Sequence, residues 1–82
     1  MDYKINTKVY PRLKALELIE KAVEIDREIG SEIGGAMIDI ITITTNAPVE
    51  GWALKVIEDN MNNKDITPYE AANNIYKEIC AR

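Results

Sequence analysis

The chain has 82 residues, with ten Lys and Arg against fourteen Asp and Glu, and a formal net charge of −4. A chain of this length forms one domain around one core, so we treat residues 1–82 as a single domain. The acidic balance argues against nucleic acid as a partner, because its capture requires clustered Lys and Arg.

Several classes of chemistry lack their usual residues. The sequence has no His and a single Cys, Cys80. Without His, Ser–His and Cys–His triads are excluded, and a zinc site is implausible. One Cys cannot form a disulfide within the chain, and the first ten residues lack the apolar stretch of a signal peptide. No apolar run reaches the roughly 18 residues of a membrane span. We therefore expect a cytoplasmic protein with no membrane segment, no metal and no cofactor, and no enzymatic activity.

The first predicted element is a strand over residues 2–9. Tyr3, Ile5, Thr7 and Val9 alternate with polar residues, and this period of two is typical of a half-buried strand. Pro11 then ends the strand and can occupy the first turn of a helix.

Residues 12–29 predict an amphipathic helix, with apolar side chains on one half of the helical wheel and charged ones on most of the other. Asp26 falls inside the apolar half. Burying an unpaired carboxylate costs several kcal/mol, so we expect Asp26 to be solvated at a fraying helix end. The alternative is a fixed contact with a basic group such as Arg12, or with a partner chain.

The segment that follows, EIGSEIGG at residues 28–35, is interpreted as a helix stop and a turn. Gly30 suits the left-handed position after a helix, and the later glycines suit a turn before the next element. The alternative is a ligand site between subunits, for a nucleotide-type molecule. Its residues would be Gly30, Ser31, Gly34 and Gly35.

Residues 37–45 predict a second strand, because Ile and Thr dominate the run and β-branched residues favour sheets. A buried helix over 31–45 is the alternative, since periodicity cannot separate the two over so short a run. Helices are predicted over 48–61, opened by Pro48, and over 68–81. Thr67 and Glu70 have the spacing of a capping box at the start of the last helix.

These elements predict a helix-rich α+β fold: a small two-stranded β element (2–9 and 37–45) with three helices (12–29, 48–61 and 68–81). The alternative is an all-α fold in which 31–45 is helical. A two-stranded sheet leaves both edges open, which favours a homo-oligomer that covers them.

The sequence favours a small non-enzymatic protein-binding regulator or inhibitor that occupies a surface of a larger protein, as a homo-oligomer. Phage and mobile-element proteins that inhibit host processes often have this profile, which is an analogy of class only. The alternatives are a small-ligand binding or sequestering protein and, third, a DNA-binding regulator. Aromatic rings anchor many interfaces, and Asp26 needs a partner. The candidate partner-binding residues are Tyr10, Asp26, Trp52, Tyr69 and Tyr76.

Overall fold

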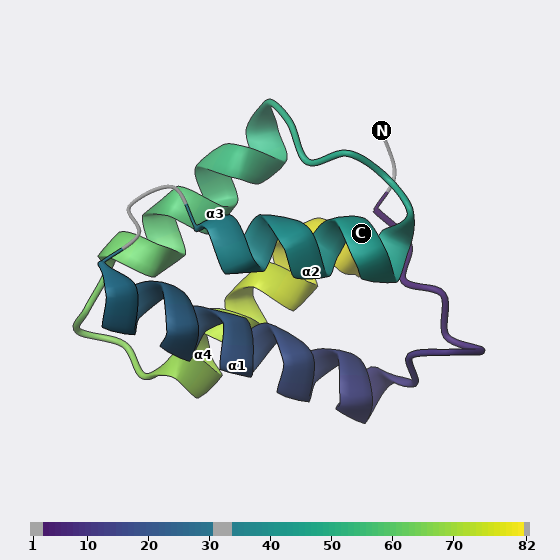
Figure 1. Cartoon of the computed structure of the whole chain (residues 1–82), viewed down its shortest axis with the longest axis horizontal. Coiled ribbons are helices and arrows are strands. Elements are labelled where there is room, and N and C mark those ends of the chain that lie inside the picture. The colour runs from purple at the N-terminus through teal and green to yellow at the C-terminus, as the bar shows by residue number, and fades with distance from the viewer. Residues whose placement is uncertain (1–2, 31–33, 82) are drawn as a thin grey trace.

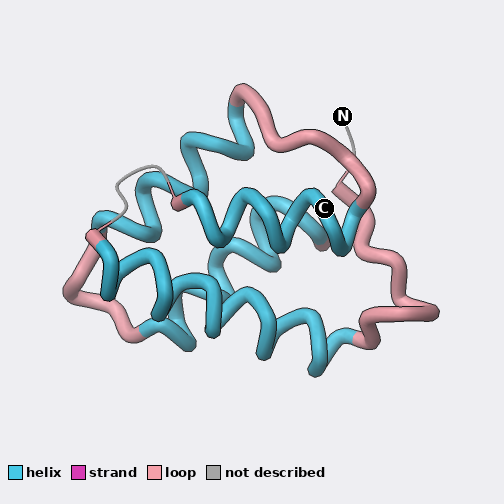
Figure 2. Tube along the Cα trace, viewed as in Figure 1, coloured by secondary structure: helices cyan, strands magenta, loops and turns pink. Residues whose placement is uncertain are grey.

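The computed structural model describes residues 3–30 and 34–81. This part of the chain consists of helices and loops (Figures 1 and 2). The helices are α1 (Arg12–Ile29), α2 (Gly35–Thr45), α3 (Trp52–Asn62) and α4 (Pro68–Ile75), and a π-helical segment over Tyr76–Cys80 continues α4.

Helix α1 confirms the helix predicted over 12–29. Part of its apolar half lies against the rest of the chain, with Ala15, Ile19 and Val23 fully buried. Gly30 ends the helix with φ 73°, and its amide donates to the carbonyl of Arg27 at 3.3 Å, which confirms the predicted helix stop.

The strand predicted over 37–45 is wrong: the segment lies within α2, so the helical alternative describes it. Its buried residues are Met37, Ile41 and Thr44, which follow the spacing of one helix face. The threonines also satisfy their hydroxyls inside the helix. Thr44 Oγ1 donates to the Ile40 carbonyl at 2.8 Å, one turn earlier, and Thr42 and Thr45 form the same kind of bond. A β-branched composition is therefore compatible with this buried helix.

The strand predicted over 2–9 is also wrong within the described residues, which form a loop without regular structure and a turn there. The Asn6 amide donates to the Thr44 carbonyl at 2.8 Å, and the Tyr10 amide donates to the Asn6 carbonyl at 2.8 Å. The segment therefore closes on itself in a turn after one contact with the end of α2. Tyr3 anchors it, because its hydroxyl donates to the Pro48 carbonyl at 3.0 Å and its side chain is buried.

Helix α3 begins at Trp52, later than the predicted start at 48, because Gly51 precedes it with φ 57°. Helix α4 begins as predicted. The Glu70 amide donates to Thr67 Oγ1 at 3.1 Å, and the Glu70 carboxylate accepts from the Thr67 amide, so the capping box is confirmed.

Helices α1 and α2 lie side by side and antiparallel, with α4 behind them and α3 along one side (Figure 1). The core forms between these layers from aliphatic side chains with no exposed surface, and each such burial stabilises the fold by about 1.5–3 kcal/mol. Its largest members are Ile19, Met37, Ile41, Ile57 and Ile75. None of the described helices has the length and apolarity that a membrane span requires.

Candidate functional site

Asp26 is fully buried in the last turn of α1 and caps the first turn of α2. Its Oδ1 accepts the amide of Ala36 at 2.8 Å, and its Oδ2 accepts the amide of Met37 at 2.9 Å. A helix N-terminus carries free amides and a partial positive charge, so a carboxylate is stabilised there. Asp26 is therefore not solvated, and no basic side chain within residues 3–30 and 34–81 pairs with it. Within the described structure its carboxylate holds two helices together.

Arg27, the next residue, connects α1 to the C-terminal end of α3, whereas Asp26 binds the N-terminal end of α2. Its Nη1 donates to the Ile66 carbonyl at 2.8 Å, and its Nη2 donates to the carbonyls of Asn60 and Asn63 at 3.1 and 2.9 Å. These carbonyls lie in and after the last turn of α3, where a cation is favoured by the helix dipole. Two adjacent residues of α1 thus fix the start of α2 and the end of α3.

The glycines predicted as an alternative ligand site lie where α1 ends and α2 begins. Gly34 is buried and precedes α2 with φ 71°, and a Cβ there would lie 2.8 Å from Ile57 Cγ2. Gly30 ends α1, Gly35 is the first residue of α2, and Ser31 lies outside the described residues. The Ala36 and Met37 amides that could meet an anion here are already bonded to Asp26.

The predicted aromatic anchors are placed against different neighbours. The Trp52 ring packs edge-on against Tyr3, with centroids 5.5 Å apart, and 37% of Trp52 is exposed. Arg12 lies over the ring of Tyr76 at 5.6 Å, and Lys14 lies over the ring of Tyr10 at 5.7 Å. Tyr69 is 60% exposed on α4. These contacts do not join the four rings into one cluster. Trp52 and Tyr3 also border, with Glu50 and Gly51, an open hollow of about 410 Å³.

Cys80 is half-buried at the end of the helical segment, and burial raises the pKa of its thiol from 9.0 to about 11. The thiolate is the reactive form, so this cysteine is held in its unreactive state at neutral pH.

We expect Cys80 to react with an aromatic disulfide reagent near neutral pH at least about tenfold more slowly in the folded chain than in urea. In the folded chain the rate should keep rising with pH towards about 11, the pKa of the buried thiol, and not level off near 9.0. Equal rates in the folded and unfolded chain would contradict this placement.

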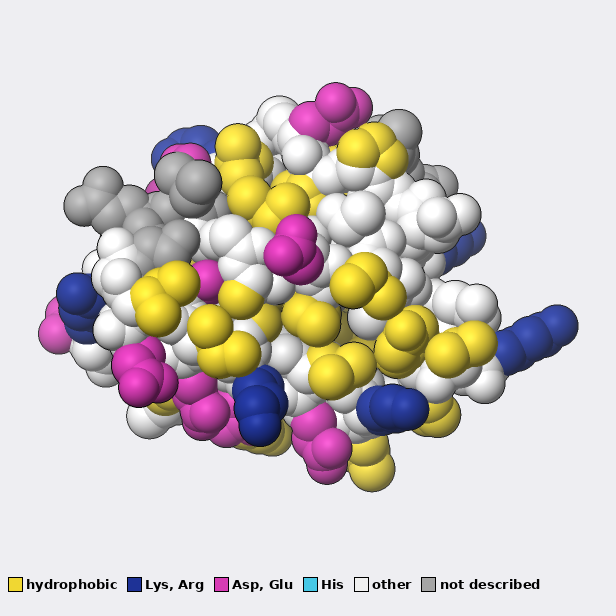
Figure 3. All heavy atoms as spheres, in the orientation of Figure 1, with side chains coloured by type: hydrophobic (Ala, Val, Ile, Leu, Met, Phe, Trp, Pro, Cys, Tyr) yellow, Lys and Arg dark blue, Asp and Glu magenta, His cyan; other side chains and the backbone are white. Residues whose placement is uncertain are grey.

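A groove of about 270 Å³ lies between α1 and α2. Figure 3 shows hydrophobic side chains gathered over both helices. Most of the lining is apolar, and two charged residues complete it. The lining residues are Leu18, Lys21, Ala22, Ile25, Ala36, Asp39 and Ile40.

Three isoleucines continue this apolar surface into solvent. Ile25 and Ile29 follow Leu18 and Ala22 along one stripe of α1, and they are 41% and 70% exposed. Ile43 follows Ile40 on α2 and is 60% exposed. We call the groove together with Ile29 and Ile43 the α1–α2 face. An exposed apolar surface of this kind is typical of an interaction site.

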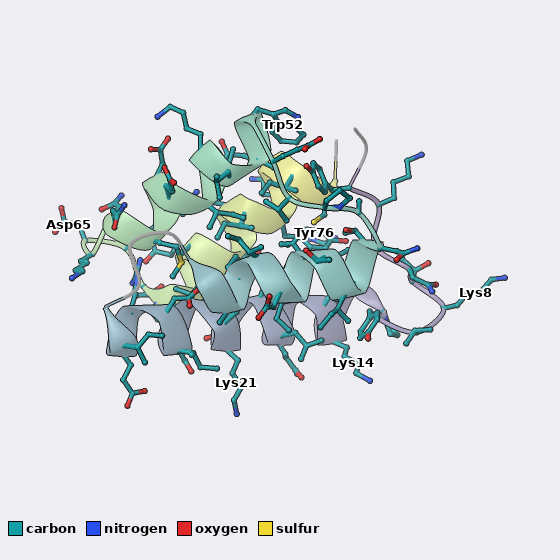
Figure 4. The ribbon with its side chains drawn as sticks, turned by 45° about the horizontal axis from the view of Figure 1, so that its top comes forward. Lys8, Lys14, Lys21, Trp52, Asp65 and Tyr76 are labelled. Carbon is teal, nitrogen blue, oxygen red and sulfur yellow. The ribbon has the colours of Figure 1, made fainter. Side chains whose placement is uncertain are left out.

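The two charged residues that line the groove have opposite sign. Lys21 stands on α1, and Figure 4 shows it extending, like Lys14, on the side away from α2. Asp39 stands on α2, and both residues are exposed. Among the residues that the structure describes, neither the Lys21 nor the Asp39 side chain has an ion-pair or hydrogen-bond partner. The groove of the α1–α2 face is thus lined by one cationic side chain, on α1, and one anionic side chain, on α2.

No group of three or more His, Cys, Asp or Glu side chains within residues 3–30 and 34–81 has an arrangement that could hold a metal ion. Comparisons of the chain with protein-family models, with characterised proteins and with solved structures found no match.

Sequence reasoning missed the isoleucines of the α1–α2 face. A signal was present, because the apolar residues of 12–29 cover half of the helical wheel, and Leu18, Ile25 and Ile29 belong to that half. Core packing alone uses a narrower arc: the buried residues of α1 lie around Ala15, Ile19 and Val23. An apolar arc wider than the chain's own core needs indicates a second surface to cover.

Proposed function

We propose that the protein is a non-enzymatic, intracellular protein-binding module of the regulator or inhibitor type, which acts by covering a surface of another chain. The observation that carries this proposal is the α1–α2 face, with Ile25, Ile29 and Ile43 exposed beside an apolar groove. Two antiparallel helices with a groove between them offer the geometry into which the apolar face of a partner helix docks.

The residue types in the chain also support binding to another protein. The sequence has no His, and burial keeps the only thiol protonated. The two charged residues on the α1–α2 face line a groove that is otherwise mostly apolar, and protein interfaces combine apolar and polar surface in this way.

A photo-crosslinking amino acid at position 43 tests the proposal, with the same amino acid at position 55 as the matched control. Lys55 is exposed on α3 and lies outside the α1–α2 face. In a lysate of the source cell, position 43 should give discrete crosslinked protein species that position 55 does not give. Adding Ile25→Asp to the chain that carries the crosslinker at position 43 should abolish these species. Identical crosslinking at the two positions would contradict the proposal.

A further inference from the structure

We infer that the chain which covers the α1–α2 face is a second copy of this protein, related by a two-fold axis that runs along the groove. This inference rests on the proposed function, because it names the partner of the same face. It does not rest on open sheet edges, since the described residues contain no strand.

The first argument is that the charges on the face of one copy are complementary to those on the same face of a second copy. A two-fold axis along the groove places α1 of one copy over α2 of the other, so that the helix with Lys21 meets the helix with Asp39 of the partner subunit. Lys21 then faces Asp39 of the partner subunit, and the symmetry makes this contact twice. An in-plane two-fold axis across the groove would instead place α1 over α1 and α2 over α2, which brings Lys21 towards Lys21 and Asp39 towards Asp39 and is unfavourable.

The second argument is the size of the face. The molecule measures 31 × 25 × 19 Å, and the α1–α2 face lies on its broadest side (Figures 1 and 3). Specific protein interfaces bury about 1,200–2,000 Å² in total. The α1–α2 face takes up only part of the 31 by 25 Å side, so a partner must cover the neighbouring surface of that side as well. A second copy presents an equally broad side and can do so.

The third argument concerns direction. Because α1 and α2 are antiparallel in one chain, the two-fold axis along the groove also makes α1 antiparallel to α2 of the partner subunit. Isoleucines 25 and 43 then meet the apolar stripes of the facing helices, and the two charge pairs form between the same helices. The proposed dimer has two layers of two helices, α1 and α2 from each copy, and the exposed isoleucines are covered between the layers.

Charge reversal tests the inference, because Lys21 and Asp39 are exposed and their replacement leaves the core intact. Lys21→Glu alone and Asp39→Lys alone each place like charges together twice per dimer, and should weaken dimerisation about tenfold. An equimolar mixture of the two variants should restore it, because each reversed charge meets a charge of opposite sign. Native mass spectrometry should show the mixed dimer in excess over both pure dimers.

Lys55→Glu and Asp59→Lys form the matched control pair on α3, where the two residues form an ion pair within one helix at 3.3 Å. These variants should dimerise like the wild type. The inference is overturned if the wild type is monomeric up to about 200 μM, if the Lys21 and Asp39 reversals leave the dimer unchanged, or if the control pair weakens it equally. A monomer that still crosslinks through position 43 would overturn the second-copy inference and leave the proposed function standing. The absence of both dimer and crosslinks would remove both.

Discussion

Replacing Asp26 with alanine is expected to lower the free energy of unfolding by about 3 kcal/mol. The carboxylate is fully buried and accepts the amides of Ala36 and Met37, so its removal leaves two amides of the first turn of α2 without their partner. A lost charge-assisted hydrogen bond costs about 1.5–3 kcal/mol, and the vacated volume adds to the loss. Urea unfolding followed by circular dichroism measures the difference.

The control for this prediction is Glu24→Ala, on the exposed side of the same helix, which should change stability by less than about 0.5 kcal/mol. Asp26→Asn should fall between the two, because an asparagine can accept one of the two amides but not both. A stability of Asp26→Ala equal to that of Glu24→Ala would refute the role of Asp26 as the cap of α2.

Gly34→Ala is expected to lower the free energy of unfolding by about 3 kcal/mol, for two separate reasons. The residue has φ 71°, which an L side chain adopts only with strain, and its Cβ would lie 2.8 Å from Ile57 Cγ2 in the core. Because Gly34 precedes α2 directly, a shift that relieves the collision moves the amides away from Asp26.

Gly30→Ala separates these two reasons in the same measurement. Gly30 has nearly the same backbone angle, φ 73°, but a Cβ there meets nothing within 4 Å. Its substitution should therefore cost only the backbone strain, about 1 kcal/mol. Equal losses at both positions would show that the close approach of Gly34 to Ile57 has no energetic consequence.

The helical parts of the fold could be predicted from sequence where the local signals were complete. The charge pattern of 12–29, the glycine at 30 and the Thr67–Glu70 capping box each determine a local structure, and the structure confirms them. Residues 37–45 could not be assigned this way, because β-branched side chains favour a strand by composition. Burial on one helical face and hydroxyl bonds to carbonyls one turn earlier decide the conformation, and both depend on the tertiary structure.

The role of Asp26 could not be predicted from the sequence either. Its position in the apolar half of α1 indicated that the carboxylate needed a partner, and a basic side chain was the obvious candidate. The partner is the backbone of α2, which any sequence can supply. Only the turn at Gly34, which brings the start of α2 against the end of α1, makes this cap available.

The candidate site, too, could be predicted from the sequence only in part. The aromatic anchors proposed from sequence are spread over separate contacts, whereas the α1–α2 face consists of aliphatic residues from two helices. Had residues 37–45 been a strand, alternate side chains would have pointed to opposite sides. The stripe of Ala36, Ile40 and Ile43 exists only because the segment is helical.

The most direct test of the proposed α1–α2 interface is the mass of the wild-type chain by sedimentation equilibrium across micromolar concentrations. One copy has a mass of 9.3 kDa. The wild type should approach twice that mass as concentration rises, while Ile43→Asp, which changes a residue 60% exposed to solvent, should stay folded at 9.3 kDa. A wild type that remains at 9.3 kDa throughout, or an Ile43→Asp variant that associates as strongly as the wild type, would contradict it.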